Sequence, residues 1–148
     1  MVKKIAGLLM TACMLTGMMS STAFAGNIKD ENFAKSVPMD TYVNTEARQK
    51  TDTTSTYVYL TQVPQAGYIR CQVQGQREYN NSGMMIWYNE TVGGGNVNLT
   101  NGEWFIRQNV YEHGGRMARL TFSLYAGAPG KVIGRWSPDS VGTGRYAN

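Results

Sequence analysis

Hydrophobic and polar residues alternate along most of the chain between residues 55 and 141. In residues 69–74 apolar side chains alternate with arginine and glutamine, and residues 117–124 repeat the same pattern. A two-residue period is typical of β-strands that bury one face. Short segments rich in glycine, proline or asparagine separate the alternating stretches, as expected for tight turns. The pattern therefore predicts an all-β protein.

About seven such stretches follow one another, and no amphipathic helix is predicted between them. Consecutive strands joined by short turns pair antiparallel, and Asn101-Gly102 suits a two-residue hairpin turn. We therefore predict a single antiparallel β-sandwich, with a small closed barrel as the alternative. The residues predicted to fill its core are Val58, Leu60, Ile69, Val73, Trp104, Ile106, Val110, Leu120, Phe122 and Leu124.

The pattern divides the chain into four segments. An N-terminal signal helix covers residues 1–25, and a polar lead-in, extended or disordered, covers residues 26–54. The β-sandwich domain covers residues 55–141 and a tail covers residues 142–148. At the end of the last strand, Trp136 is interpreted as a core side chain, and Pro138 and Asp139 as a turn that ends the strand.

Residues 1–25 have the three parts of a cleaved secretory signal peptide. Two lysines precede an uncharged apolar run of about 15 residues, shorter than the roughly 20 that span a bilayer as a helix. Ala23 and Ala25 have the small-x-small spacing of a cleavage site, which makes Gly26 the mature N-terminus. The alternatives are an uncleaved membrane anchor and lipid attachment at Cys13, which the apolar residues after Cys13 disfavour.

Removal of the signal peptide changes the charge and the cysteine count. The formal net charge falls from +4 to +2, which disfavours nucleic acid as a partner. Cys71 is then the only cysteine, so no internal disulfide can form. Because small eukaryotic secreted domains usually contain disulfides, the composition favours a secreted bacterial protein, with no membrane segment in its mature form. The oligomeric state is left open.

Several short motifs carry a resemblance to a known group of proteins. They are residues 50–59, 89–93, 102–107 with 109–112, and the terminal Gly134-Arg-Trp-Ser-Pro-Asp-Ser140. The chain resembles small secreted, uncharacterised all-β proteins of Gram-positive bacteria that end in Gly-x-Trp-Ser-Pro-Asp-Ser. The resemblance implies export and an all-β fold, and it supplies no catalytic residues.

Catalytic and metal sites receive little support from the residues present. Cys71 and His113 would be the thiol and imidazole of a nucleophilic dyad, but Cys71 lies on an apolar strand face where a thiol is unreactive. One cysteine and one histidine cannot form the usual zinc sets, so we predict no metal and no cofactor. A glycosidase-like pair would have to come from the scattered acids Glu78, Glu90, Glu103, Glu112 and Asp139.

Tyrosine and arginine dominate the strand positions opposite the predicted core. Such side chains are frequent in recognition surfaces, although they also cover ordinary sheets as cross-strand pairs. Phe105 is expected on the same outward positions. The residues that we select as ligand-binding are Tyr57, Tyr59, Arg70, Arg107, Tyr111 and Arg119.

These observations lead to three functional hypotheses. The first is a secreted, non-enzymatic binding module for a cell-surface glycan, the cell wall or a protein ligand. The second is an exported bacteriocin-like antagonist. The third is a secreted hydrolase, which the sequence disfavours because it lacks a coherent catalytic set.

Overall fold

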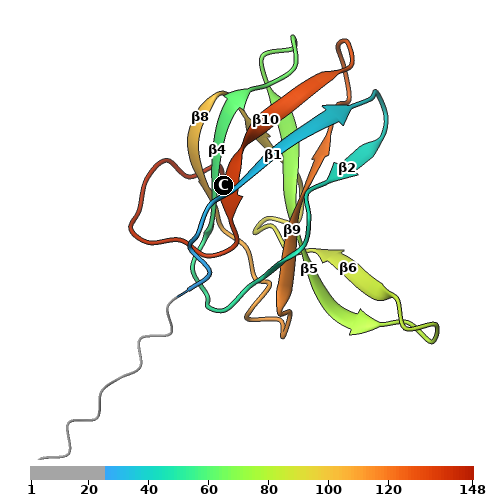
Figure 1. Cartoon of the computed structure of the whole chain (residues 1–148), viewed down its shortest axis with the longest axis vertical. Coiled ribbons are helices and arrows are strands. Elements are labelled where there is room, and N and C mark those ends of the chain that lie inside the picture. The colour runs from blue at the N-terminus through green and yellow to red at the C-terminus, as the bar shows by residue number, and fades with distance from the viewer. Residues whose placement is uncertain (1–25) are drawn as a thin grey trace, which may run out of the picture.

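The computed structural model describes residues 26–148. This part of the chain is all-β, with ten strands in two antiparallel sheets (Figure 1). None of its residues forms a helix that is long and apolar enough to cross a membrane. The predicted signal peptide and its cleavage residues Ala23 and Ala25 lie outside the described residues.

Each sheet has a simple order of neighbouring strands. The four-stranded sheet runs β1-β10-β4-β8, and the other runs β2-β9-β5-β6, with β3 added on β9 and β7 on β5. The strands are β1 (Glu31–Val37), β2 (Tyr42–Asn44), β3 (Arg48–Gln49), β4 (Thr56–Gln62), β5 (Ile69–Tyr79), β6 (Met85–Asn89), β7 (Val97–Leu99), β8 (Gly102–Ile106), β9 (Met117–Ser123) and β10 (Gly130–Ser137).

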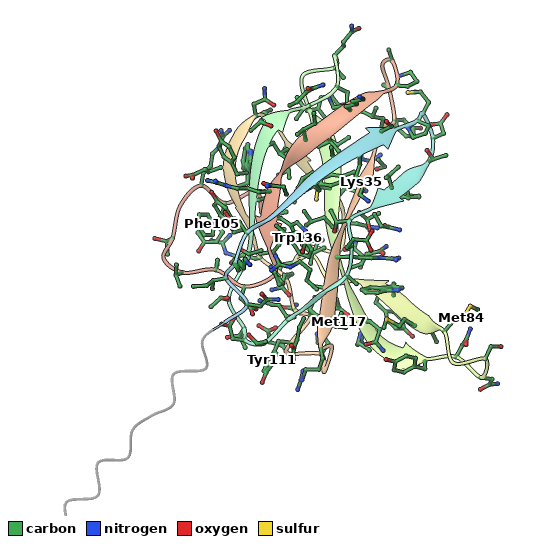
Figure 2. The ribbon with its side chains drawn as sticks, in the orientation of Figure 1. Lys35, Met84, Phe105, Tyr111, Met117 and Trp136 are labelled. Carbon is green, nitrogen blue, oxygen red and sulfur yellow. The ribbon has the colours of Figure 1, made fainter. Side chains whose placement is uncertain are left out.

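One hydrophobic cluster receives side chains from both sheets. All ten residues predicted for the core are buried in it, which confirms the expected sides of β4, β5, β8 and β9. Trp136 of β10 is 1% exposed and lies inside the body, whereas Met84 lies in the exposed turn of the β5–β6 hairpin (Figure 2). Complete burial of one large apolar side chain contributes about 1.5–3 kcal/mol, so this cluster is the main stabilising element.

Strands begin earlier in the chain than the sequence pattern indicates. The segment predicted as a lead-in contributes β1, β2 and β3, and β1 pairs with β10 over its whole length. Phe33 and Val37 of β1 face the core, but Lys35 lies between them on the same side. Because this polar residue interrupts the apolar alternation, the sequence pattern does not predict the strand. The described chain consequently has ten strands rather than about seven.

The C-terminal tail covers part of the four-stranded sheet. Phe105 N donates to Arg145 O at 2.8 Å, and Ala147 N donates to Phe105 O at 2.9 Å. The Phe105 ring packs on Tyr146 with ring centroids 5.8 Å apart. Phe105, expected at the surface, is therefore only 8% exposed, because residues of the tail lie over it.

The pairing of β10 with β4 contains an irregularity at Gly134. The register shifts between Ile133 and Gly134, and a Cβ atom at residue 134 would overlap the carbonyl oxygen of Tyr59. The two strands approach closely here because residue 134 has no side chain.

We predict that Gly134→Ala destabilises the protein by about 3 kcal/mol, because the new methyl group meets rigid backbone. Gly95→Ala is the control, since a Cβ at residue 95 has open space around it. Urea unfolding of both variants measures the difference. Equal stability of the two variants would contradict the close approach.

Candidate functional site

The six predicted ligand-binding residues do not form one surface. Tyr57 and Tyr59 lie on β4 of the four-stranded sheet, whereas Arg70 and Arg119 lie on β5 and β9 of the other sheet. Because the inner sides of both sheets meet in the core, their outward sides face in different directions. Arg107 and Tyr111 follow the end of β8.

Tyr57, Tyr59 and Arg119 each have a partner within the chain. The Tyr57 hydroxyl donates to the Glu103 carboxylate at 2.8 Å. Burial is the larger cause that raises the pKa of Tyr57, and the neighbouring Glu103 carboxylate is the second. The Tyr59 ring lies 4.9 Å from the Arg135 guanidinium. Arg119 donates to the Gln74 side chain at 2.8 Å and stacks on a tryptophan of β6.

Arg107 and Tyr111 also have intramolecular partners. The Arg107 guanidinium stacks on Tyr146 of the tail at 4.0 Å and donates to the backbone oxygen of Asn148. Tyr111 carries the Arg116 guanidinium over its ring at 4.2 Å. These arginines and tyrosines therefore pair with one another first, and a ligand would have to compete with those contacts.

Arg70 differs from the other five residues because its aromatic neighbours are open to solvent. It lies 5.6 Å from the ring of Tyr125, and the two line a groove of about 180 Å³ together with Tyr42. Tyr125 is 74% exposed and Tyr42 is 67% exposed, more than any other tyrosine of residues 26–148. The remaining residues of this groove are Asp40, Thr41, Ser123 and Leu124.

Backbone contacts hold the two sides of this groove together. The turn between β1 and β2 pairs with the end of β9, since Met39 bridges Leu124 and Asp40 N donates to Leu124 O at 3.3 Å. Asp40 is the one described non-glycine residue with a left-handed φ, 53°, a conformation that aspartate tolerates. Ser123 pairs with both Tyr42 and Arg70 across the sheet. We name this site the Tyr42–Tyr125 groove.

A second, larger groove of about 420 Å³ lies over β1, β4 and β10. Tyr59 and Arg135 line it, together with Asn32 and Thr61. Tyr59 is half-buried and already has Arg135 against its ring, so this groove offers less free aromatic surface than the Tyr42–Tyr125 groove.

Glu90 forms a buried polar cluster at another place. Its Oε2 atom is 2.6 Å from His113 Nδ1, and its Oε1 atom is 2.6 Å from Arg77 Nε without hydrogen-bond alignment. In the neutral tautomer that donates from Nδ1 to Glu90, His113 Nε2 keeps its lone pair. Such a pair can orient a general base, but none of the described contacts of His113 involves a nucleophile.

Cys71, the thiol considered for a dyad with His113, lies in the hydrophobic core. It is fully buried there, its Sγ atom donates a weak hydrogen bond to the Gln72 carbonyl oxygen at 3.9 Å, and burial raises its pKa. Within residues 26–148 no group of three or more histidine, cysteine, aspartate or glutamate side chains is arranged to hold a metal ion.

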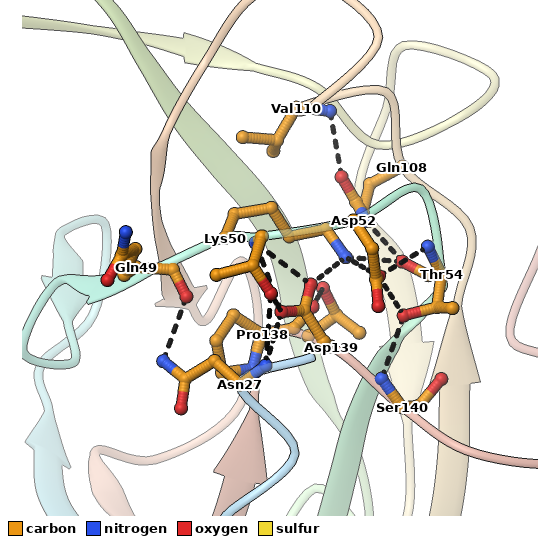
Figure 3. Close-up of polar contacts among 12 residues, drawn as sticks. Asn27, Gln49, Lys50, Asp52, Thr54, Gln108, Val110, Pro138, Asp139 and Ser140 are labelled. Carbon is orange, nitrogen blue, oxygen red and sulfur yellow. Dashed lines mark hydrogen bonds and ion pairs between the residues drawn. The ribbon is translucent and has the colours of Figure 1, made fainter. Parts of the chain in front are cut away.

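The most buried charges belong to Lys50 and Asp139, whose side chains are both 0% exposed. Lys50 Nζ donates to Asp139 Oδ1 at 2.6 Å and to Thr54 O at 2.5 Å, and it lies 3.6 Å from Asp52 Oδ1 (Figure 3). Asp139 Oδ2 accepts from Asn27 N at 2.6 Å and from both N and Oγ1 of Thr51, at 3.0 and 2.6 Å.

Two neighbouring residues extend this network into the loop after β8 and the segment after β10. Gln108 Nε2 donates to Thr54 O at 2.8 Å, while Val110 N donates to Gln108 Oε1 at 2.8 Å. Ser140 N donates to Thr54 Oγ1 at 2.9 Å. We call Asn27, Lys50, Thr51, Asp52, Thr54, Gln108, Asp139 and Ser140 the Lys50–Asp139 cluster.

The cluster keeps Asp139 ionised. Burial alone raises the pKa of this carboxyl group, but the hydrogen bonds from Lys50, Thr51 and Asn27 and the Lys50 charge outweigh burial and lower the pKa. The turn predicted at Pro138 and Asp139 does follow β10. The sequence gives no sign of the partner, because Lys50 is 89 residues away in a segment without clear alternation.

The five acids considered as a catalytic pair have separate surroundings. Asp139 and Glu90 are buried beside cationic partners, and Glu103 accepts from Tyr57. Glu78 and Glu112 are exposed. The geometry therefore favours structural roles for Asp139 and Glu90.

The fold and these sites define a small all-β protein in which a buried ion pair joins segments from the two ends of the described chain. The chain belongs to the family described as "Protein of unknown function (DUF2712)", whose model matches residues 21–140. Neither the curated proteins nor the solved structures give a match.

We predict that Lys50→Met destabilises the protein by about 3–5 kcal/mol, because Asp139 is left as a buried unpaired charge. Adding Asp139→Asn removes that charge and keeps an acceptor for Asn27 N and Thr51. The double variant is therefore expected to recover about 1–2 kcal/mol relative to Lys50→Met. A double-mutant cycle from urea unfolding measures this coupling, and additive effects would contradict it.

A second prediction concerns how the stability of the protein depends on pH. Because the pKa of folded Asp139 is lowered, its contribution to stability is complete above the unfolded value of about 3.9 and is lost as pH falls through the folded pKa. The free energy of unfolding of the wild type should therefore decrease more between about pH 4 and pH 2 than that of Lys50→Met/Asp139→Asn. Parallel pH profiles would show that Asp139 is not responsible.

Proposed function

We propose that this chain is a secreted, non-enzymatic β-sandwich module that binds a cell-surface or cell-wall glycan in the Tyr42–Tyr125 groove. One observation carries the proposal: the two most exposed tyrosines of residues 26–148 line a single groove together with Arg70.

The sandwich and the secretion have different kinds of support. Two antiparallel sheets that contribute to a single hydrophobic cluster favour a sandwich over a closed barrel. Secretion from a Gram-positive bacterium is supported by the sequence of residues 1–25 and by the single cysteine of the remaining chain.

The side chains of the groove suit sugars. Exposed tyrosine rings offer flat apolar surfaces for the C–H faces of a pyranose, while Arg70, Asp40 and Ser123 supply donors and acceptors for hydroxyl groups. Arg70 also favours glycans that carry carboxylate or phosphate groups, since guanidinium pairs with these in a forked geometry.

The groove is also ordered before a ligand binds. Backbone pairing between the β1–β2 turn and the end of β9 positions the groove walls, so little conformational entropy is lost on binding. Large apolar side chains that remain exposed to water beside such a groove are typical of binding sites.

We expect Tyr42→Ala, Tyr125→Ala and Arg70→Gln each to weaken binding to isolated cell wall or to an anionic glycan about tenfold or more. Thermal stability should change little because these side chains are not in the core. Tyr79→Ala is the matched control, since Tyr79 is 61% exposed but lies in the β5–β6 hairpin.

Sedimentation with cell wall, followed by titration with soluble fragments, measures the affinities. Unchanged binding by all three groove variants, or an equal loss in Tyr79→Ala, would contradict the proposal. A variant of Tyr59 tests the larger groove in the same assay.

A further inference from the structure

The described chain begins against the Lys50–Asp139 cluster. A Cβ atom at Gly26 would lie 2.5 Å from Asp52 Oδ2 and 3.0 Å from Asp139 Cβ, so the backbone of Gly26 packs directly on both acids. The next residue is fixed as well, because Asn27 N donates to Asp139 Oδ2 at 2.6 Å.

Negative charges outnumber positive charges around Gly26. The carboxylates of Asp52 and Asp139 face one ammonium group, that of Lys50. The nearby Arg48 is occupied by Glu31, at 3.0 Å, and by the Trp136 carbonyl oxygen. One negative charge is therefore in excess beside Gly26.

Asp52 directs one oxygen toward that position. Its Oδ1 atom accepts from Thr54 N and Thr54 Oγ1, at 2.8 and 2.5 Å. Its Oδ2 atom accepts no hydrogen bond from residues 26–148, is open to solvent, and is the oxygen closest to the Cβ position of Gly26. A positively charged donor on Gly26 would pair with this oxygen and balance the charge.

We infer that Asp52 binds the α-ammonium group that cleavage between Ala25 and Gly26 creates, so that processing completes the Lys50–Asp139 cluster. This inference rests on the secretion included in the proposed function. In the cleavage a peptidase breaks the Ala25 C–Gly26 N bond with one water molecule. The hydroxyl group joins the Ala25 carbonyl carbon and the hydrogen joins the amine, which takes a second proton from solvent to become an ammonium group.

The geometry permits this ion pair without a rearrangement of the fold. The nitrogen and the Cβ position of one residue are about 2.5 Å apart, so Gly26 N lies within about 5 Å of Asp52 Oδ2. Opposite charges at about 4–6 Å attract appreciably, and a side-chain rotation of the partly exposed Asp52 shortens the gap. Before cleavage the same nitrogen is a neutral amide.

The test uses a chain in which a site-specific protease sequence directly precedes Gly26, so that one reagent frees the α-ammonium group. We expect release to raise the folding equilibrium constant about fivefold, as measured by urea unfolding before and after cleavage. Asp52→Asn should abolish the increase, whereas the matched Asp30→Asn should keep it, since Asp30 pairs with Arg135 at the surface.

A second measurement reports on the amine itself. Acylation of the Gly26 α-amine at neutral pH should be several-fold slower in the released wild type than in released Asp52→Asn. Unchanged stability on release, or an equal acylation rate in the two proteins, overturns the assignment of Asp52.

Sequencing of the exported chain separates this inference from the proposed function. An N-terminus at Gly26 supports both. A different N-terminus overturns the processing step and the predicted cleavage, but it leaves glycan binding to be judged by the groove variants. Conversely, failure of the groove variants leaves the result of the release experiment unchanged.

Discussion

The ion pair between Lys50 and Asp139 is the interaction on which the arrangement of this chain depends. Transfer of two charges from water into a protein interior costs several kcal/mol per ion, and attraction offsets this cost only when further hydrogen bonds complete the geometry. Here Asn27, Thr51 and Thr54 supply those bonds, so segments far apart in sequence must all be in place. Partial assembly would leave a buried charge without a partner. The pair therefore favours a folded state in which both ends of the described chain are in place together.

The same region explains why β1 is a stable strand despite its mostly polar sequence. Its pairing with β10 brings Glu31 opposite Trp136, and Arg48 links the two by pairing with Glu31 and donating to the Trp136 carbonyl oxygen. The indole of Trp136 adds a cation–π contact with Arg48, at 5.6 Å. These contacts lie close to the Lys50–Asp139 cluster, since Ser137 and Pro138 connect Trp136 to Asp139. Long-range polar contacts thus hold a strand that local sequence preference alone would not specify.

The sequence predicted the parts of this structure that obey a local rule. Alternation assigned residues such as Val58, Leu120 and Phe122 to the core because opposite sides of a strand differ in burial. It missed β1, where Lys35 occupies a core-facing position, and it placed Phe105 at the surface because nothing local shows that the tail covers this residue. Of the predicted binding residues only Arg70 lines the Tyr42–Tyr125 groove. Tyr42 follows the turn after β1 in a segment without clear alternation, and Tyr125 lies just beyond the end of β9, at the start of a bend. Pairing between distant polar residues, such as Lys50 and Asp139, has no period and cannot be derived from one sequence.

β1 connects the Lys50–Asp139 cluster to the Tyr42–Tyr125 groove. The Lys50–Asp139 cluster holds Asn27, four residues before β1, and the Tyr42–Tyr125 groove begins at Asp40, three residues after it. A seven-residue strand is about 20 Å long, so the two sites share no side chain and have separate charges. Since β1 is paired with β10 along its whole length, anchoring at one end restricts the position of the turn at the other. Weakening of the cluster should therefore reach the groove only through loss of this strand, whereas substitutions in the groove leave the cluster intact. This separation allows the stability of the chain and the proposed glycan binding to be measured independently.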